Sequence, residues 1–169
     1  MDLPPDSGPL SDRQPLPVLT GRAWAFADNL SAAEILPPRA GVLSAAEAAR
    51  QLFAALDPAL AALLAPGDVL VAGCNLGVGP GGHEAARALA AAGVIAVVAA
   101  SFAPGFADTL LAAGIPPLEV DAPAIFHTGH RVRIKLEAGT IADLSSGDRQ
   151  PIRNLTEALL DRLRLQFRR

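Results

Sequence analysis

The sequence of 169 residues contains one cysteine, Cys74. One thiol cannot form an intrachain disulfide, and it cannot build a metal site made only of cysteines. The chain also carries little charge, since 18% of its residues are charged and the formal net charge is −3. Nucleic-acid-binding domains present a basic surface, so this balance argues against nucleic acid as a partner.

Long apolar runs are absent as well. No run approaches the ~18 residues of a membrane-spanning helix, and the N-terminus lacks the basic-then-apolar order of a secretory signal. We therefore expect a cytoplasmic protein without a membrane partner. Residues 1–17 are rich in Pro, Asp and Ser and predict a tail that forms no core, followed by a single domain over residues 18–169.

The most informative stretch is a strand followed by a glycine-rich loop and a helix. Residues 68–72 form a short apolar run after the turn signal Pro66-Gly67, which is typical of a buried strand. Residues 77–82 contain four glycines and one proline, and helix-forming residues occupy 84–92. Backbone N–H groups before a helix N-terminus favour an anion. The expected donors are the amides of Gly77, Val78, Gly79, Gly81, Gly82 and His83.

The whole pattern predicts an α/β fold with a partly parallel central sheet. Two buried strands joined by a helix form a parallel unit, and strict alternation over 131–136 predicts a half-exposed strand. Strands are expected over 18–26, 68–72, 94–99, 118–120, 131–136 and 141–144. Helices are expected over 44–56, 59–64, 84–92, 102–113 and about 154–168.

The start and the faces of the last helix can also be predicted. Asn154–Glu157 resembles a capping box, as does Ser44–Glu47 for the first helix. The helix is expected to bury Leu155, Leu159, Leu163 and Phe167. Its last turns hold arginines, interpreted as a solvated end that suits the helix dipole rather than as a binding patch. These are Arg162, Arg164, Arg168 and Arg169.

Several segments occur in an order that resembles a known family. They are Gly21–Asn29, Ile35–Pro37, Asp57-Pro58, Pro66–Gly73, Asn75–Gly79, Ala91–Val98 and Ser101–Ala103. This order is similar to the small subunits of isopropylmalate isomerase (3-isopropylmalate dehydratase) and homoaconitase, of the aconitase superfamily, over residues 21–144. The resemblance implies a single aconitase-type swivelling β/β/α domain.

The resemblance also implies a reaction and a partner. The partner is a large subunit, in a heterodimer or heterotetramer, that carries a four-iron–four-sulfur (4Fe-4S) cluster, while this chain holds no cofactor. The pair is a hydro-lyase that moves the hydroxyl group of a small di- or tricarboxylate by one carbon. The small subunit of such a pair supplies a serine base and an arginine carboxylate clamp from a loop that reads Gly-x-Gly-Ser-Ser-Arg-Glu-His.

The chain departs from this pattern at the catalytic positions. Pro80, Gly81 and Gly82 stand where the family has two serines and the arginine. A base needs a side-chain acceptor and a bidentate clamp needs a guanidinium, so these residues predict a degenerate loop. Ser31-Ala-Ala33 replaces Asp-Thr-Asp, and Pro104 replaces another arginine. Two hypotheses stay open: a small subunit with altered chemistry, and an inactive relative that binds a carboxylate or a partner.

Other candidate residues have a structural interpretation beside the functional one. His83 and Glu84 form a replacement acid/base pair or simply begin a helix. Asp28-Asn29 matches the family and reaches the site, or only forms a turn. For Cys74 a small packed residue is favoured over a nucleophile.

Two further functions are weakly indicated. His127 and His130 flank a turn, but no third metal ligand lies near them in the sequence. Residues 77–82 match the dinucleotide fingerprint G-x-G-x-x-G. That fingerprint expects an acidic residue at the end of the next strand, and residues 97–102 contain none.

Overall fold

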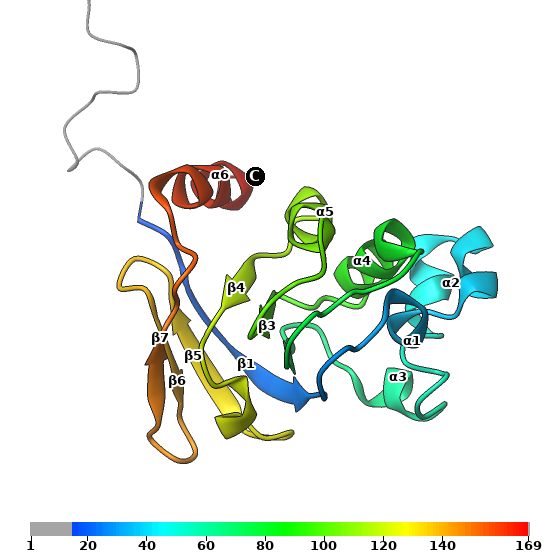
Figure 1. Cartoon of the computed structure of the whole chain (residues 1–169), viewed down its shortest axis with the longest axis horizontal. Coiled ribbons are helices and arrows are strands. Elements are labelled where there is room, and N and C mark those ends of the chain that lie inside the picture. The colour runs from blue at the N-terminus through cyan, green and yellow to red at the C-terminus, as the bar shows by residue number, and fades with distance from the viewer. Residues whose placement is uncertain (1–14, 169) are drawn as a thin grey trace, which may run out of the picture.

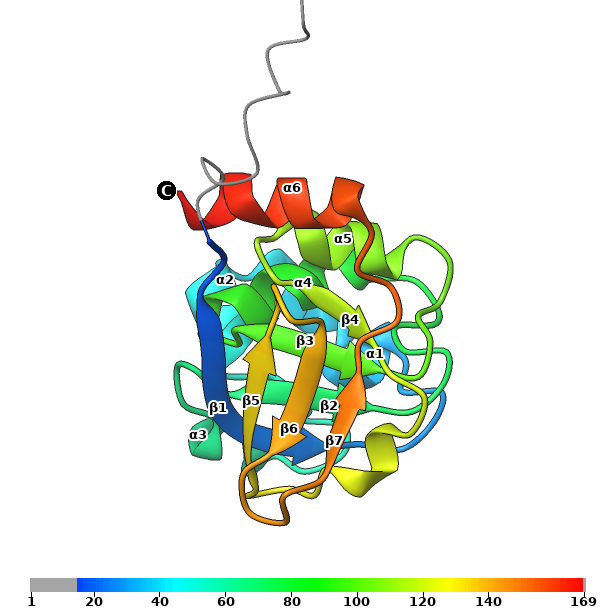
Figure 2. The same ribbon diagram turned by 90° about the vertical axis from the view of Figure 1, so that its left-hand side faces the viewer.

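The computed structural model describes residues 15–168, and its strands form one curled sheet in the order β4-β3-β2-β1-β5-β6-β7 (Figures 1 and 2). The parallel strands are β1 (Val18–Ala25), β2 (Val69–Ala72), β3 (Ala96–Ala99) and β4 (Pro117–Glu119). The antiparallel strands are β5 (Arg131–Lys135), β6 (Thr140–Asp143) and β7 (Arg149–Pro151). The predicted α/β class and partly parallel sheet are confirmed. Residues 1–14 of the predicted tail, and Arg169, lie outside the described residues.

Short helices cover one face of the parallel half, and the longest helix lies across one end of the molecule (Figures 1 and 2). The α-helices are α1 (Ala32–Ile35), α2 (Ala45–Ala49), α3 (Leu60–Leu63), α4 (Gly82–Ala91), α5 (Phe106–Ala112) and α6 (Glu157–Phe167). The 3₁₀ helices are η2 (Pro38–Val42) and η3 (Pro123–Ile125). Within residues 15–168, every helix is too short or too polar to cross a membrane.

The central parallel strands β2 and β3 are buried on both faces, which divides the core in two. Leu70 and Ala72 of β2 pack in the core that includes α1, α2, α4 and α5. Val69 and Val71 point the other way, into a core shared with β5, β6 and α6. A strand buried on both faces reads as a continuous apolar run, which is why β2 and β3 were predictable without alternation.

Side-chain amides join the two edge strands of the sheet. Gln150 of β7 accepts a hydrogen bond from the Ala122 N–H (2.8 Å) and donates one to the Ala122 carbonyl (2.7 Å). Asn154 accepts from the Glu119 N–H and donates to the Pro117 carbonyl, both at 2.9 Å. The Asn154 amide takes the place of a neighbouring strand along β4, and the Gln150 amide does the same for Ala122 in the segment that follows, so the edge of β4 is covered rather than left open.

The predicted helix over 44–56 is wrong beyond its first turns. α2 ends at Ala49, and Phe53 has a left-handed backbone with φ 60°. The Phe53 N–H donates to the Ile35 carbonyl (2.7 Å) instead of continuing a helix, and its ring stacks on Phe26 with 4.5 Å between centroids. The helical spacing of apolar residues is overridden because tertiary contacts bury Phe53 in a turn, while Leu56 stays 46% exposed.

Helix boundaries at α5 and α6 also differ from the predictions. α5 begins at Phe106 rather than at residue 102, because the Ala103 N–H pairs with the Leu76 carbonyl (2.8 Å). α6 is capped by Thr156, not Asn154, because Asn154 is bound to β4. The elements α1 and β7 are absent from the predicted set.

The predicted faces of α6 are only partly confirmed. Leu163 is fully buried, but Phe167 is 38% exposed. The Arg164 side chain is 12% exposed and forms ion pairs with Glu137 (3.2 Å) and Asp161 (2.9 Å). Arg164 therefore packs against the β5–β6 turn, which corrects its interpretation as part of a solvated end.

Asp143 of β6 is a buried carboxylate that holds the β6–β7 turn. It accepts hydrogen bonds from the N–H groups of Ser145 (2.8 Å) and Ser146 (3.2 Å) and from Nδ1 of His130 (2.7 Å). Burial by itself raises the pKa of Asp143, but the His130 hydrogen bond, the two backbone donors and the histidine charge outweigh it. The pKa of Asp143 is therefore lowered from its ordinary 3.8.

Because this pKa is lowered on folding, the ionised Asp143 stabilises the fold above about pH 4 and the contribution is lost as pH falls further. We expect Asp143→Asn to lower the free energy of unfolding at pH 6 by about 1–3 kcal/mol, since backbone donors lose their acceptor. We also expect the variant to lose less stability than wild type between pH 6 and pH 3. Urea titrations at both pH values measure this. Asp148→Asn, an exposed change in the same turn, is the control, and an equal pH response in both variants would contradict the assignment.

Candidate functional site

The glycine-rich loop lies at the carboxyl edge of the parallel strands, between the loops that follow β1 and β3 (Figure 1). On the β1 side, the Gly77 N–H donates to the Leu30 carbonyl (2.8 Å) and the Ala32 N–H donates to the Val78 carbonyl (2.9 Å). These bonds continue the parallel pairing beyond the strands. Backbone pairing therefore fixes the first half of the loop.

Two asparagines shape the root of this loop. Asn29 and Asn75 both have left-handed backbones with φ 59°, a conformation that asparagine tolerates better than most residues. The Asn75 amide donates to the Asn29 side-chain oxygen at 3.2 Å. Asp28 accepts from the Cys74 N–H at 2.7 Å. Asp28-Asn29 thus forms the predicted turn and also binds the root of the glycine loop.

The ring of Phe106 lies under the loop and explains one glycine. A Cβ atom at Gly77 would lie 2.2 Å from the Phe106 ring, which is 3% exposed. At Gly82 the same ring would lie 3.3 Å away. Gly79 and Gly81 face open space but have φ 89° and 98°, so their requirement is conformational.

The predicted backbone donors are therefore not equivalent. Gly77 is buried and its N–H is already bound to Leu30, which removes it from the expected set. Helix α4 begins at Gly82, after the N-cap Gly81, so the amides of Gly82, His83 and Glu84 belong to its first turn. The exposed Gly79 and half-buried Val78 precede that turn.

His83 and Glu84 are both exposed at the start of α4. Neighbouring residues on a helix do not face each other. Glu84 lines the hollow beside the loop, and His83 is not among its lining residues. The geometry therefore gives no support to a joint acid/base pair.

Beside the loop lies a cleft of about 340 Å³. One wall comes from η2 and the two residues before it, and the other comes from the glycine loop and the first turn of α4. The lining is mostly apolar, with one carboxylate from Glu84. Its residues are Leu36, Pro37, Pro38, Val42, Pro80, Gly81 and Glu84.

A second hollow of about 530 Å³ lies at the carboxyl ends of β1 and β2. Cys74 lines it and is exposed, which corrects the expectation of a packed cysteine. His127 also lines it and meets the His130 ring edge-on at 5.3 Å between centroids. Within residues 15–168 no three His, Cys, Asp or Glu side chains are grouped so as to hold a metal ion.

Comparison with known proteins places these features in a family. The family model of the aconitase C-terminal domain matches residues 64–123, which include the glycine loop. The small subunit of 3-isopropylmalate dehydratase from Nautilia profundicola is 36% identical over 131 residues, covering 77% of this chain and 79% of that subunit. The methanogen homoaconitase small subunit from Methanothermobacter thermautotrophicus is 33% identical over 146 residues, covering 85% of this chain and 84% of that one.

A solved structure agrees with these relatives. The crystal structure of 3-isopropylmalate dehydratase from Methanocaldococcus jannaschii superposes with a TM-score of 0.81 at 26% identity. The match covers 89% of this chain and 95% of that one. The likeness therefore extends over nearly the whole fold.

The contact between Gly77 and Phe106 can be tested with a matched pair of substitutions. Gly77→Ala and Gly79→Ala both place alanine at a positive φ, near 87° and 89°, so they share the conformational cost of about 1 kcal/mol. Only Gly77→Ala drives a Cβ into the Phe106 ring. We expect it to lower the free energy of unfolding by ~1–3 kcal/mol more than Gly79→Ala, as overpacking does. Equal losses in urea titrations would show that the ring does not limit the loop.

Proposed function

The chain belongs to the family of small subunits of 3-isopropylmalate dehydratase and homoaconitase, and on that premise we propose that it is the small subunit of a hydro-lyase of this type. The extent of the match carries the proposal, since relatives in this family align over 77% or more of the chain. The large subunit of such a pair would complete the site. The glycine loop and the apolar cleft are the surfaces that would meet the substrate.

The iron–sulfur cluster implied by this family does not fit the residues of this chain. A four-iron–four-sulfur cluster is held by several thiolates. The sequence contains one cysteine, and that residue, Cys74, lies exposed with no group of metal ligands around it among residues 15–168. We therefore assign the cluster to the large subunit and no step of the chemistry to a metal held here.

We propose that the loop binds a carboxylate with its backbone but supplies neither base nor clamp. The first-turn amides of α4 stand at the positive end of the helix dipole, which favours an anion. Pro80 and Gly81 have no side-chain acceptor, and Gly82 has no guanidinium. Losing one side-chain donor to the transition state typically lowers kcat by ~10²–10³. The chain is thus a binding and shaping subunit with a degenerate catalytic loop.

The cleft beside the loop favours one substrate class within the family. Leu36, Pro37 and Val42 give it an apolar wall, which suits a branched alkyl group. Glu84 would repel a further carboxylate placed there. We therefore propose an alkyl-substituted malate, as in the isopropylmalate isomerases, rather than the longer tricarboxylate of the homoaconitases.

Restoring the missing side chains tests the degenerate loop. Serine at position 81 would meet φ 98°, so the repair is limited to Pro80→Ser with Gly82→Arg. Gly82→Arg brings Cβ to 3.3 Å from Phe106, a contact that a small shift can relieve. With a cognate large subunit, we expect the double variant to turn over isopropylmalate on the order of 10²-fold faster than wild type.

Pro80→Ala with Gly82→Met is the matched control, because it removes the proline ring without adding a hydroxyl and adds a long side chain at position 82 without a charge. Coupled assays of isopropylmalate formation report the rates, and copurification reports the complex. If wild type already equals the repaired variant, other residues carry the chemistry and His83→Ala becomes the next variant to test.

Backbone binding of a carboxylate can be measured on the chain alone. We expect malate or citrate to bind weakly, near millimolar, which corresponds to ~4 kcal/mol. The amide resonances of Gly82, His83 and Glu84 should shift during the titration, whereas that of Gly77 should not, since its N–H is bound to Leu30. First-turn amides that stay still at tens of millimolar ligand would rule out the loop as a carboxylate site.

A further inference from the structure

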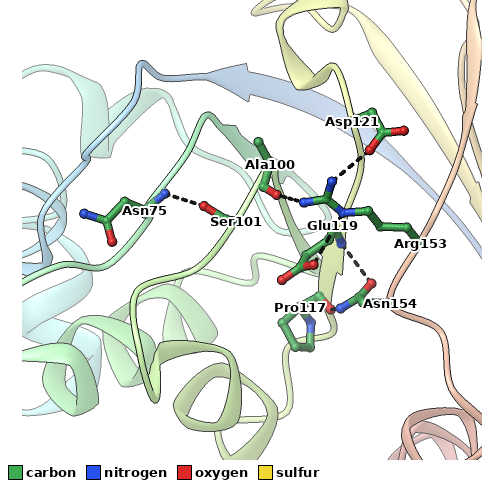
Figure 3. Close-up of polar contacts among 8 residues, drawn as sticks. All are labelled: Asn75, Ala100, Ser101, Pro117, Glu119, Asp121, Arg153 and Asn154. Carbon is green, nitrogen blue, oxygen red and sulfur yellow. Dashed lines mark hydrogen bonds and ion pairs between the residues drawn. The ribbon is translucent and has the colours of Figure 1, made fainter.

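Arg153 lies where the closing segment after β7 meets the end of β3 (Figure 3). Its backbone N–H donates to the Glu119 carbonyl at 2.9 Å. Its guanidinium donates to the Ala100 carbonyl and to Oδ1 of Asp121 (2.8 Å), and it lies 3.5 Å from a Glu119 carboxylate oxygen. One side chain therefore joins β3, β4 and the segment that closes the sheet.

Ala100 is the first residue of the segment that holds the root of the glycine loop. The Ala100 N–H donates to the Gly73 carbonyl (3.1 Å). The next residue, Ser101, accepts from the Asn75 N–H through Oγ (2.8 Å) and from the Leu76 N–H through its carbonyl (3.1 Å), as Figure 3 shows for Asn75. Two successive loop amides thus depend on where Ser101 lies.

The backbone conformation of Asn75 makes the loop sensitive to the position of Ser101. The left-handed backbone of Asn75, φ 59°, is tolerated by asparagine better than by most residues but is still less favourable than an ordinary conformation, so neighbouring groups help to hold it. The Ser101 hydroxyl and the Asn29 side chain are two of those neighbours. Gly77 follows two residues later, so a shift of Asn75 would move the amides of the loop.

The ion pairs of Arg153 do not by themselves explain its placement. The side chain is 45% exposed, and its partners Glu119 and Asp121 are 30% and 75% exposed. Exposed ion pairs contribute little to stability. A guanidinium, however, is a planar fork with donors in fixed directions, so it can orient a carbonyl and two carboxylates at once.

We infer that Arg153 is a positioning residue for the glycine loop, acting through Ala100 and Ser101. The inference deepens the proposed function and rests on it only where the ligand is concerned. Arg153 touches no candidate ligand atom itself. Arg153 links the segment that closes the sheet to Ala100, which adjoins the root of the glycine loop. Through this link, the C-terminal segment determines where the backbone N–H donors of the loop lie.

Asn154 provides a matched control on the neighbouring position. It binds the same strand through Glu119 and Pro117, and neither of these hydrogen bonds involves Ala100. Asn154→Ala weakens the closure of the sheet, and Arg153→Ala weakens the closure and the link to Ser101. A difference between the two variants in amide exchange at the loop therefore reports the link from Arg153 to Ser101.

Amide hydrogen exchange of the full chain tests the inference. In Arg153→Ala we expect exchange at Asn75 and Leu76 to rise on the order of tenfold beyond the change at a core strand amide such as Val97. In Asn154→Ala, the exchange rates of the loop amides and of the core strand amide should rise by the same factor. Arg153→Lys should behave like Arg153→Ala, because an ammonium group keeps the charge but lacks the fork.

Two outcomes would overturn the inference. One is that Arg153→Ala raises the exchange rates of the loop and core amides by the same factor, as Asn154→Ala is expected to do. The other is that lysine restores wild-type exchange, which would make charge rather than geometry the cause. A malate titration adds a second readout. We expect Arg153→Ala to bind malate several-fold more weakly than wild type, and Asn154→Ala to bind it as wild type does. If wild type binds no malate, the proposed ligand fails, while the exchange comparison still decides the role of Arg153.

Discussion

The parallel pairing of β2 with β1 and β3 is the constraint on which the rest of the structure depends. All four residues of β2 are buried, and their side chains enter two separate cores. The pairing does not end with the strand, since Gly77 and Leu76 continue it to the neighbouring loops. The start of the glycine loop is therefore placed by backbone hydrogen bonds, and the side chains of Ser101 and Asn29 hold its root at Asn75.

The same sheet must also turn back over itself, and β1 makes this possible. Its last residues pair in parallel with β2, whereas Val18–Arg22 pair antiparallel with β5. The antiparallel half then covers the face of β2 that the helices leave open, and Gln150 and Asn154 bind the far edge. A fold closed in this way brings its C-terminal segment into contact with the carboxyl edge of its parallel strands, beside the candidate site.

Much of the fold could be predicted from the sequence where local pattern and burial agree. The continuous apolar run of β2 and the strict alternation of β5 are confirmed. Phe53 and Asn154 were misjudged because their partners, Ile35 and Glu119, are distant in sequence. The glycine loop could be found from composition alone. That Gly77 is required by the ring of Phe106, and that Arg153 reaches Ala100, depends on contacts no local pattern contains.

In the glycine loop, the residues that fix the backbone conformation differ from the side chains that would act on a ligand. Gly77 is fixed by packing, and Gly79 and Gly81 are fixed by positive φ. Neither requirement involves a serine or an arginine at positions 80 to 82. Side chains that act on a ligand can therefore be lost while the backbone cradle, the Asn29–Asn75 contact and the adjoining cleft keep their form. Family membership and the proposed loss of the base are thus compatible in one chain, because the backbone hydrogen bonds that hold the start of the loop do not involve the side chains at positions 80 to 82.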